Sequence, residues 1–166
     1  HNQKIKFIES LPNKVAQSLK VRTYNDDGWK TKQRFKERLG SKNMLKPMKL
    51  KKAFGSAKVI VCTYPETSFL EAMNSNIPTI FLHKKEYYEF HPFFDKLVNI
   101  LEEAKIIFND PVDAASHINE IWNDPGIWWN RSDVIFARNF FLEQCGNANE
   151  NWLESWADSL KKYAFN

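Results

Sequence analysis

A strand–helix–strand unit over residues 58–82 constrains the fold of this chain more than any other stretch. Residues 59–62 form a short apolar run without polar alternation, which is typical of a central parallel strand covered on both faces. A polar turn and a short amphipathic helix follow, and a second apolar strand is predicted at Thr79–Leu82. The unit has the size of one right-handed crossover. We therefore expect an α/β fold.

Further strands are predicted at residues 19–24 and 105–108, with helical patterns between successive strands. This alternation predicts a mostly parallel sheet of about four strands with helices on both faces and a C-terminal helical tail. Asp110 and Pro111 are expected to begin a helix, with Asp as its N-cap. No internal boundary interrupts the pattern, so residues 1–166 are interpreted as a single domain.

The tail carries five of the six tryptophans. Tryptophans pack in cores and between helices more often than they stack on ligands, so we expect most of them to be buried. Ser132 is predicted to cap a helix within this tail. The tail side chains expected to point inward are Trp128, Trp129, Phe136, Phe140, Trp152 and Trp156.

Composition and charge narrow the functional classes. The 166 residues carry a formal net charge of +4, and no apolar run approaches the ~20 residues of a membrane-spanning helix. Lysines concentrate between Lys30 and Lys58, a pattern that attracts nucleic acid or anionic lipid but more often marks a solvated surface. Two cysteines do not form a disulfide scaffold, so we expect reduced thiols in a cytoplasmic protein.

Neither a metal site nor a cofactor is predicted. His83 and His91 lie in one loop, but no pair of His or Cys shows zinc-ligand spacing. The five glycines are scattered, and they form neither a dinucleotide fingerprint nor a P-loop. A G-x-S-x-G elbow is also absent. These observations argue against dinucleotide oxidoreductases, P-loop kinases and serine hydrolases.

Polar side chains mark the start of the helix that follows residues 59–62. In open α/β sheets, ligands bind beyond the carboxyl ends of the strands. Thr67 and Ser68 stand in the first helical turn, where free backbone N–H groups and the helix dipole can hold a phosphate. Glu71, one turn later, can accept hydrogen bonds from sugar hydroxyls. The alternative is that Thr67 and Ser68 only cap the helix and Glu71 is solvated.

Two other segments are expected at the same edge. Arg22 lies at the end of the predicted strand 19–24, and Arg is suited to bidentate phosphate recognition, although a surface salt bridge is an alternative. Tyr64 in the turn, and Tyr87 and His91 in the loop after residue 82, are candidates for covering a base or a sugar. Aromatic residues of this kind also pack loops against the body of a protein.

Several motifs together resemble one family. They are Arg22-Thr-Tyr…Gly28-Trp29, Thr63-Tyr-Pro-Glu-Thr-Ser-Phe-Leu-Glu71 and Asn76-Ile-Pro-Thr-Ile80, followed by the tryptophan-rich tail. With this tail they are similar to bacterial surface-carbohydrate transferases of the leptospiral type. The resemblance implies a GT-B architecture, in which two Rossmann-like domains enclose the active site. This chain would be the Rossmann-like C-terminal half, with the N-terminal half absent.

The resemblance also implies roles for the site residues. Thr67 and Ser68 would contact the phosphates of a nucleotide-sugar donor, Glu71 would contact a donor hydroxyl, and Arg22 would neutralise the leaving group. Helix ends and basic side chains would stabilise the departing phosphate without a metal. The glycan or lipid-linked acceptor and the general base would belong to the N-terminal half, so no catalytic base is assigned. Glu66 departs from this picture, because a carboxylate beside a phosphate is unfavourable unless it points away.

Other functions stay open. A non-catalytic α/β interaction module would dock through an apolar patch on the last two helices, whereas a transferase would pack those helices on the sheet domain or against the missing half. A nucleotide-sugar epimerase would place His or Glu side chains in the same cleft. A nucleic-acid-binding domain would use the lysines between residues 30 and 58. The sequence favours a cytoplasmic glycosyltransferase of surface glycan biosynthesis, associated with the inner membrane face and without a nucleic-acid partner.

Overall fold

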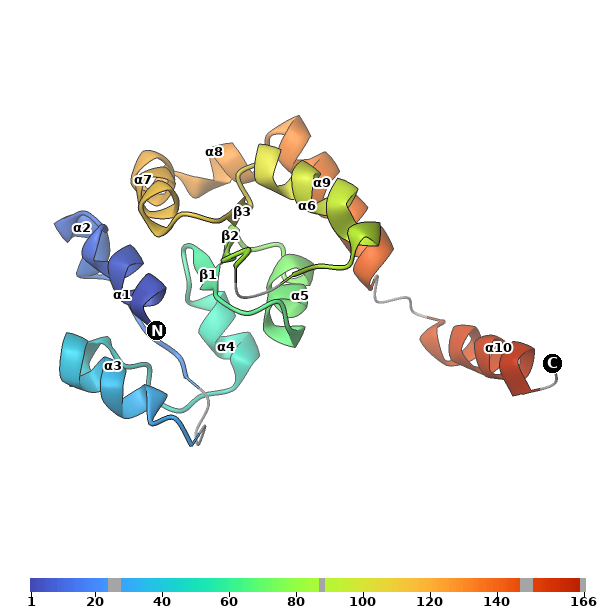
Figure 1. The fold of residues 1–166 in the computed structure, drawn as a ribbon, viewed down its shortest axis with the longest axis horizontal. Helices are drawn as coiled ribbons and strands as arrows, with labels where there is room; N and C mark the ends of the chain where they lie inside the picture. The colour runs from blue at the N-terminus through green and yellow to red at the C-terminus, as the bar shows by residue number, and fades with distance from the viewer. Residues whose placement is uncertain (24–27, 87–88, 147–150, 165–166) are drawn as a thin grey trace.

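The centre of the fold is a three-stranded parallel sheet. The computed structural model describes residues 1–23, 28–86, 89–146 and 151–164, and Figure 1 shows their arrangement. The strands are β1 (Ile60–Cys62), β2 (Thr79–Leu82) and β3 (Ile107–Phe108), in the order β1-β2-β3. Every residue of β2 is buried, as expected for a parallel strand covered on both faces. The predicted α/β class is confirmed.

Helices cover both faces of this sheet. In Figure 1, α5, α6 and α9 lie on one side of the strands, and α7 and α1 lie on the other. The helices are α1 (Asn2–Glu9), α2 (Asn13–Ala16), α3 (Thr31–Leu39), α4 (Leu50–Gly55), α5 (Thr67–Asn74), α6 (Asp95–Glu103), α7 (Pro111–Ile121), α8 (Pro125–Trp129), α9 (Ser132–Cys145) and α10 (Trp152–Ala164), with single 3-10 turns η1 (Ser41–Asn43) and η2 (Pro92–Phe94). Aromatic packing connects the layers, because the Phe69 ring of α5 lies 4.9 Å from Phe81 and 5.1 Å from Phe141.

Of the two predicted helix caps, the one at the start of α7 is confirmed and the one at the start of α9 is wrong. The Asp110 carboxylate accepts hydrogen bonds from the backbone N–H groups of Val112 (2.6 Å) and Asp113 (3.3 Å), which confirms the predicted cap of α7. The predicted cap at Ser132 is wrong, because α9 begins at Ser132 and its N-cap is Arg131. The Arg131 guanidinium instead forms an ion pair with Asp133 in the first turn of α9.

The predicted strand at residues 19–24 is wrong for the part of it that the structure describes. Val21 forms an isolated parallel bridge with Met44, outside the three-stranded sheet. Its backbone groups are satisfied there, since Val21 N–H donates to Asn43 O at 2.8 Å and Leu45 N–H donates to Val21 O at 2.9 Å. The alternating sequence has the propensity for a strand, but its partner is a loop. The sheet consequently has three strands instead of about four.

The tail is buried at its beginning and exposed at its end. Trp128 and Trp129 are 3% and 2% exposed, which confirms their predicted packing. Trp152 and Trp156 are mostly exposed, so the prediction that they pack inward is wrong. Their helix, α10, lies apart from the rest of the fold in Figure 1.

The predicted inner side of α9 is also partly wrong. Phe136 is exposed and Phe140 is half-buried, while Val134, Ala137 and Phe141 face the core. Both sets of positions have helical spacing, so periodicity alone does not distinguish them. The observed packing buries the side of α9 on which Ala137 lies, and Ala137 itself is fully buried.

Asn76 links the end of α5 to α8 and α9. Its backbone is left-handed, with φ of 55°, a conformation that Asn tolerates better than most residues. The Trp129 indole Nε1–H lies 3.1 Å from Asn76 Oδ1 and 3.2 Å from its backbone oxygen, and Arg138 also donates to Oδ1. The Arg138 guanidinium lies 4.3 Å from the Trp129 ring centroid. These three residues therefore fix the connection that leads into β2.

We predict that Asn76→Ala lowers the free energy of unfolding by about 3 kcal/mol, because it removes an acceptor for two donors and strains a left-handed backbone position. Asn76→Gly is the matched control: it loses the acceptor but tolerates the backbone, so its loss should be smaller. Urea unfolding of the three proteins measures both effects. An Asn76→Ala variant as stable as the wild type would contradict the proposed role of this residue.

Candidate functional site

A small cavity lies at the carboxyl ends of β1 and β2. Its volume is about 80 Å³, and the residues lining it are Thr63 and Tyr64 after β1, Leu82 and Lys84 at the end of β2, and His1, Gln3 and Lys4 at the start of α1. This is the edge at which open parallel sheets bind ligands. Helix α1, at the N-terminal end of the chain, forms one wall of the cavity.

Two lysines give this cavity a positive character. Lys4 Nζ lies 4.0 Å from the centroid of the Tyr64 ring, which is within cation–π distance. The Lys84 side chain is only 22% exposed, and its Nζ lies 3.0 Å from an oxygen of the exposed Glu86 carboxylate. A third lining residue offers an acceptor, because Gln3 Oε1 is buried and has no hydrogen-bond partner in the described part of the chain. The cavity can therefore receive an anionic group that also carries a hydrogen-bond donor.

The start of α5 lies three residues beyond Tyr64. Its N-cap is Glu66, which has an exposed side chain, and no cap hydrogen bond from that side chain is present. Thr67 and Ser68 therefore occupy the first turn as predicted, but neither is the N-cap residue. Thr67 and Glu71 are exposed and Ser68 is half-buried. None of these three lines the small cavity, so contact with the same ligand requires that the ligand extend beyond it.

Of the remaining predicted residues, neither Arg22 nor His91 lines the small cavity. Arg22 is exposed and follows Val21, whose bridge among the described residues lies outside the sheet, so the premise that Arg22 ends a sheet strand is wrong. His91 is exposed, and its Nδ1 accepts a hydrogen bond from Phe93 N–H at 3.2 Å at the start of η2. Tyr87 lies outside the described residues. The binding roles of these residues stay predictions.

Two buried titratable groups near the strand ends are neutral at pH 7. His83 is 2% exposed and its ring packs 5.4 Å from Phe81 and 4.6 Å from Phe90. Burial lowers the pKa of His83, with Glu102 acting in the opposite direction and Lys85 lowering it further. Burial raises the pKa of Cys62 to about 12, so its thiol is not an activated nucleophile. Neither group lines the small cavity, where Lys4 and Lys84 are the lysine side chains.

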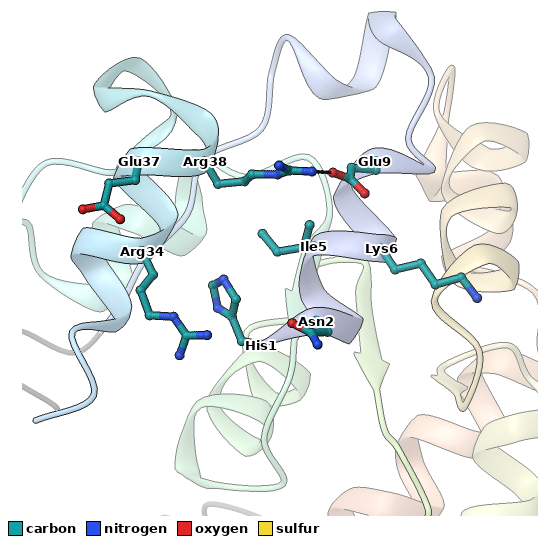
Figure 2. Close-up of a pocket in the computed structure, with 8 residues that line it drawn as sticks. All are labelled: His1, Asn2, Ile5, Lys6, Glu9, Arg34, Glu37 and Arg38. Atoms are coloured by element: carbon teal, nitrogen blue, oxygen red, sulfur yellow. Dashed lines mark hydrogen bonds and ion pairs between the residues drawn. The ribbon is translucent and has the colours of Figure 1, made fainter.

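A larger open cavity of about 620 Å³ lies between α1 and α3 (Figure 2). Arg38 of α3 forms an ion pair with Glu9 of α1 across it, and Arg34 points toward His1. The Lys6 side chain points away from the cavity, and its Nζ lies 3.9 Å from Asp110 Oδ2. His1 lines both this cavity and the small one at the sheet edge, so the two are neighbours. Positive and negative side chains both line the larger cavity, so it favours an anion less than the small cavity does.

Sequence reasoning missed Lys4, Gln3 and Lys84 as lining residues. Lys84 follows the predicted strand Thr79–Leu82 after one residue, and the strand-end rule applied to Thr67 would also have found it. Nothing in the sequence indicates that Gln3 and Lys4 approach Tyr64, because the contact depends on how α1 packs. Among the described residues, no group of three or more His, Cys, Asp or Glu side chains is arranged to hold a metal ion.

The fold and the site define an α/β protein with a cationic cavity at the carboxyl edge of a parallel sheet. Residues 1–160 match the sequence model of the LIC12162 family transferase. The chain belongs to this family, and the predicted membership of a transferase family is confirmed. No curated protein and no solved structure matches the chain. Within the described ranges, every helix is too short or too polar to cross a membrane.

We predict that stability falls as the pH is lowered from 7.5 to 5.5. Burial holds the pKa of His83 and of His117 below the usual value of about 6.5. Below that pH the unfolded chain binds protons that the folded chain does not, so unfolding becomes more favourable. Urea midpoints across this range measure the decline. His83→Gln should reduce it, whereas His91→Gln, a change at an exposed histidine, should leave it intact; a flat pH profile in the wild type would contradict this assignment.

Proposed function

We propose that this chain is the donor-binding half of a GT-B glycosyltransferase and holds the phosphates of a nucleotide sugar at the carboxyl edge of its sheet. One observation carries the proposal: Lys4 and Lys84, from elements far apart in sequence, line the same small cavity. Membership of a transferase family supports a group-transfer reaction. The start of α5, a few residues from Tyr64, adds backbone N–H groups and a helix dipole to the same edge.

The size of the cavity indicates which part of a donor it holds. Pockets that enclose a whole ligand commonly measure about 300–1,000 Å³. The cavity of about 80 Å³ accommodates a phosphate-sized group, so the nucleoside and the sugar would lie outside it. Thr67, Ser68 and Glu71 lie on the α5 side, where their hydroxyl and carboxylate groups can contact a second phosphate and a sugar hydroxyl. The partly exposed Tyr64 ring offers a surface for a base or a sugar.

This arrangement fits the electrostatic demand of glycosyl transfer. The bond between the anomeric carbon and the phosphate oxygen breaks, and the phosphate leaves with the electron pair. The acceptor hydroxyl forms the new bond to that carbon and loses its proton to a general base. Lys4, Lys84 and the α5 N-terminus would stabilise the charge that develops on the departing phosphate.

The proposal assigns the sugar acceptor to a part of the enzyme other than this chain. A glycan or a lipid-linked sugar would be delivered by the other half of a GT-B enzyme, in bacterial surface glycan biosynthesis at the inner face of the membrane. The general base would come from that half as well. The chain alone should therefore bind a nucleotide sugar weakly and transfer little or no sugar.

We predict that Lys84→Ala and Lys4→Ala each weaken the binding of a nucleoside-diphosphate sugar by about tenfold or more, because each removes a charge-assisted contact to phosphate. Lys14→Ala, at an exposed lysine of α2, is the matched control and should bind like the wild type. Isothermal titration calorimetry measures the affinities of the wild type and the three variants. Equal affinity in all variants would show that the phosphate does not enter the small cavity.

A titration with UDP-, GDP- and CMP-sugars tests the proposal more broadly. Amide shifts in the NMR spectrum should concentrate at Thr67, Ser68, Glu71 and Lys84, and the base that binds tightest identifies the donor. Shifts should weaken as salt is added, because the contact is largely ionic. If no nucleotide sugar produces shifts at these residues, the proposed donor site is wrong.

A further inference from the structure

Positive charge is concentrated in the first third of the chain. Residues 1–58 contain sixteen Lys and Arg and only four Asp and Glu. Residues 59–166 have the opposite balance, with eight Lys and Arg and sixteen Asp and Glu. The modest formal net charge of +4 is therefore the sum of a strongly basic part and an acidic part. Such asymmetry is typical of a protein that meets an anionic surface with one side.

The fold keeps much of this positive charge together around α3. Residues 19–23 run beside the segment that follows α3, because Val21 bridges Met44 and Lys20 Nζ donates to Lys42 O at 2.7 Å. Helix α3 packs against η1 in that segment. We call residues 19–23 and 28–46 the basic surface. In Figure 1, α3 lies at the end of the molecule opposite α10.

Charges on the basic surface are little compensated within the described chain. Nine Lys and Arg side chains are exposed there, and Glu37 supplies the one carboxylate among its described residues. Of these nine cations, only Arg38 forms an ion pair with another described residue, Glu9. The Glu37 carboxylate accepts a hydrogen bond from the Gln33 amide at 2.8 Å. Unpaired like charges repel one another, and an anionic partner relieves that repulsion.

The side chains of this region suit a lipid headgroup layer better than a nucleic acid. Nine of the eleven cations in residues 28–58 are Lys. Arg presents a planar fork that reads bases and phosphates bidentately, whereas Lys is a point charge suited to diffuse attraction by anionic headgroups. Trp29, next to Lys30 at the start of α3, is 78% exposed. Trp is enriched where headgroups meet acyl chains.

We propose that the basic surface docks this protein on an anionic lipid bilayer, with Trp29 entering the headgroup layer. The same headgroups repel the acidic part of the chain, residues 59–166, so the docked molecule has a preferred orientation. The larger cavity, which Arg34 and Arg38 of the basic surface line, shares His1 with the small cavity at the sheet edge. Docking would therefore hold the proposed donor site close to a lipid-linked acceptor.

This inference rests on the proposed function in taking a membrane as the partner, but its test needs no nucleotide. Co-sedimentation with vesicles should show binding to phosphatidylcholine that contains phosphatidylglycerol, no binding to phosphatidylcholine alone, and release as salt is added. The variant Lys32→Gln/Lys36→Gln/Lys42→Gln/Lys46→Gln should weaken vesicle binding by at least about tenfold, because each Lys near an anionic surface contributes up to about fivefold. All four side chains are exposed, and unchanged thermal unfolding confirms that the variant folds.

A matched control removes four exposed lysines from the acidic part: Lys96→Gln/Lys105→Gln/Lys161→Gln/Lys162→Gln. It lowers the net charge equally and should bind vesicles within about twofold of the wild type. Trp29→Ser should weaken the binding that persists at high salt, because salt does not screen an apolar contact. The first variant should bind a nucleoside-diphosphate sugar like the wild type, so a failure of docking and a failure of the donor site are separate results.

Three results would overturn the proposal. The first is a wild-type chain that ignores phosphatidylglycerol vesicles. The second is a control that loses as much vesicle binding as the basic-surface variant, because the contact would then not depend on this surface. The third is single-stranded RNA or duplex DNA that binds through the same four lysines and displaces the chain from vesicles, which would identify the partner as a nucleic acid.

Discussion

The rest of the structure depends on the burial of β2 on both faces. Thr79 and Ile80 are fully buried, and Phe81 and Leu82 nearly so. The one polar side chain in this strand is satisfied locally, because the Thr79 hydroxyl donates to Ile77 O at 2.7 Å. A strand buried in this way requires a helix layer on each side and a parallel neighbour on each edge, which β1 and β3 provide. The parallel pairing in turn brings the carboxyl ends of the strands to one edge, where the cationic cavity lies.

Two of the segments that carry the predicted resemblance lie at opposite edges of this sheet. Asn76, before the start of β2, and Trp129 hold the fold together through the hydrogen bonds to Trp129 Nε1 and Arg138. The segment from Thr63 to Glu71 follows the end of β1 and borders the cavity. A change at Asn76 should therefore affect stability, while a change around Thr67 should affect binding. The two segments would therefore have different physical roles.

The central unit was predictable from sequence because its signals are local. The predicted strand Thr79–Leu82 has the observed bounds, since an unbroken apolar run between turn residues leaves few other choices. The cap at Asp110 was predictable for the same reason. Tertiary partners were not predictable: residues 19–23 have strand propensity, but Val21 pairs only with Met44 in the described chain.

The candidate site was predictable in outline only. The edge follows from parallel topology, and Thr67 and Ser68 begin α5 as expected. The approach of Lys4 to Tyr64 depends on how α1 packs against the sheet, and no short-range pattern encodes it. Which side of α9 faces the core was equally undetermined, because apolar residues lie on more than one side of that helix: Val134 and Phe141 are buried, whereas Phe136 is exposed.

Hydrogen–deuterium exchange with and without a nucleoside-diphosphate sugar tests the central claim most directly, namely that the phosphate site lies at the carboxyl edge of the sheet. The account predicts new protection at residues 63–69 and 82–85, with little change along α3. Protection confined to α1 and α3, around the cavity that Arg34 and Arg38 line, would contradict it, and so would an exchange pattern that the sugar nucleotide leaves unchanged.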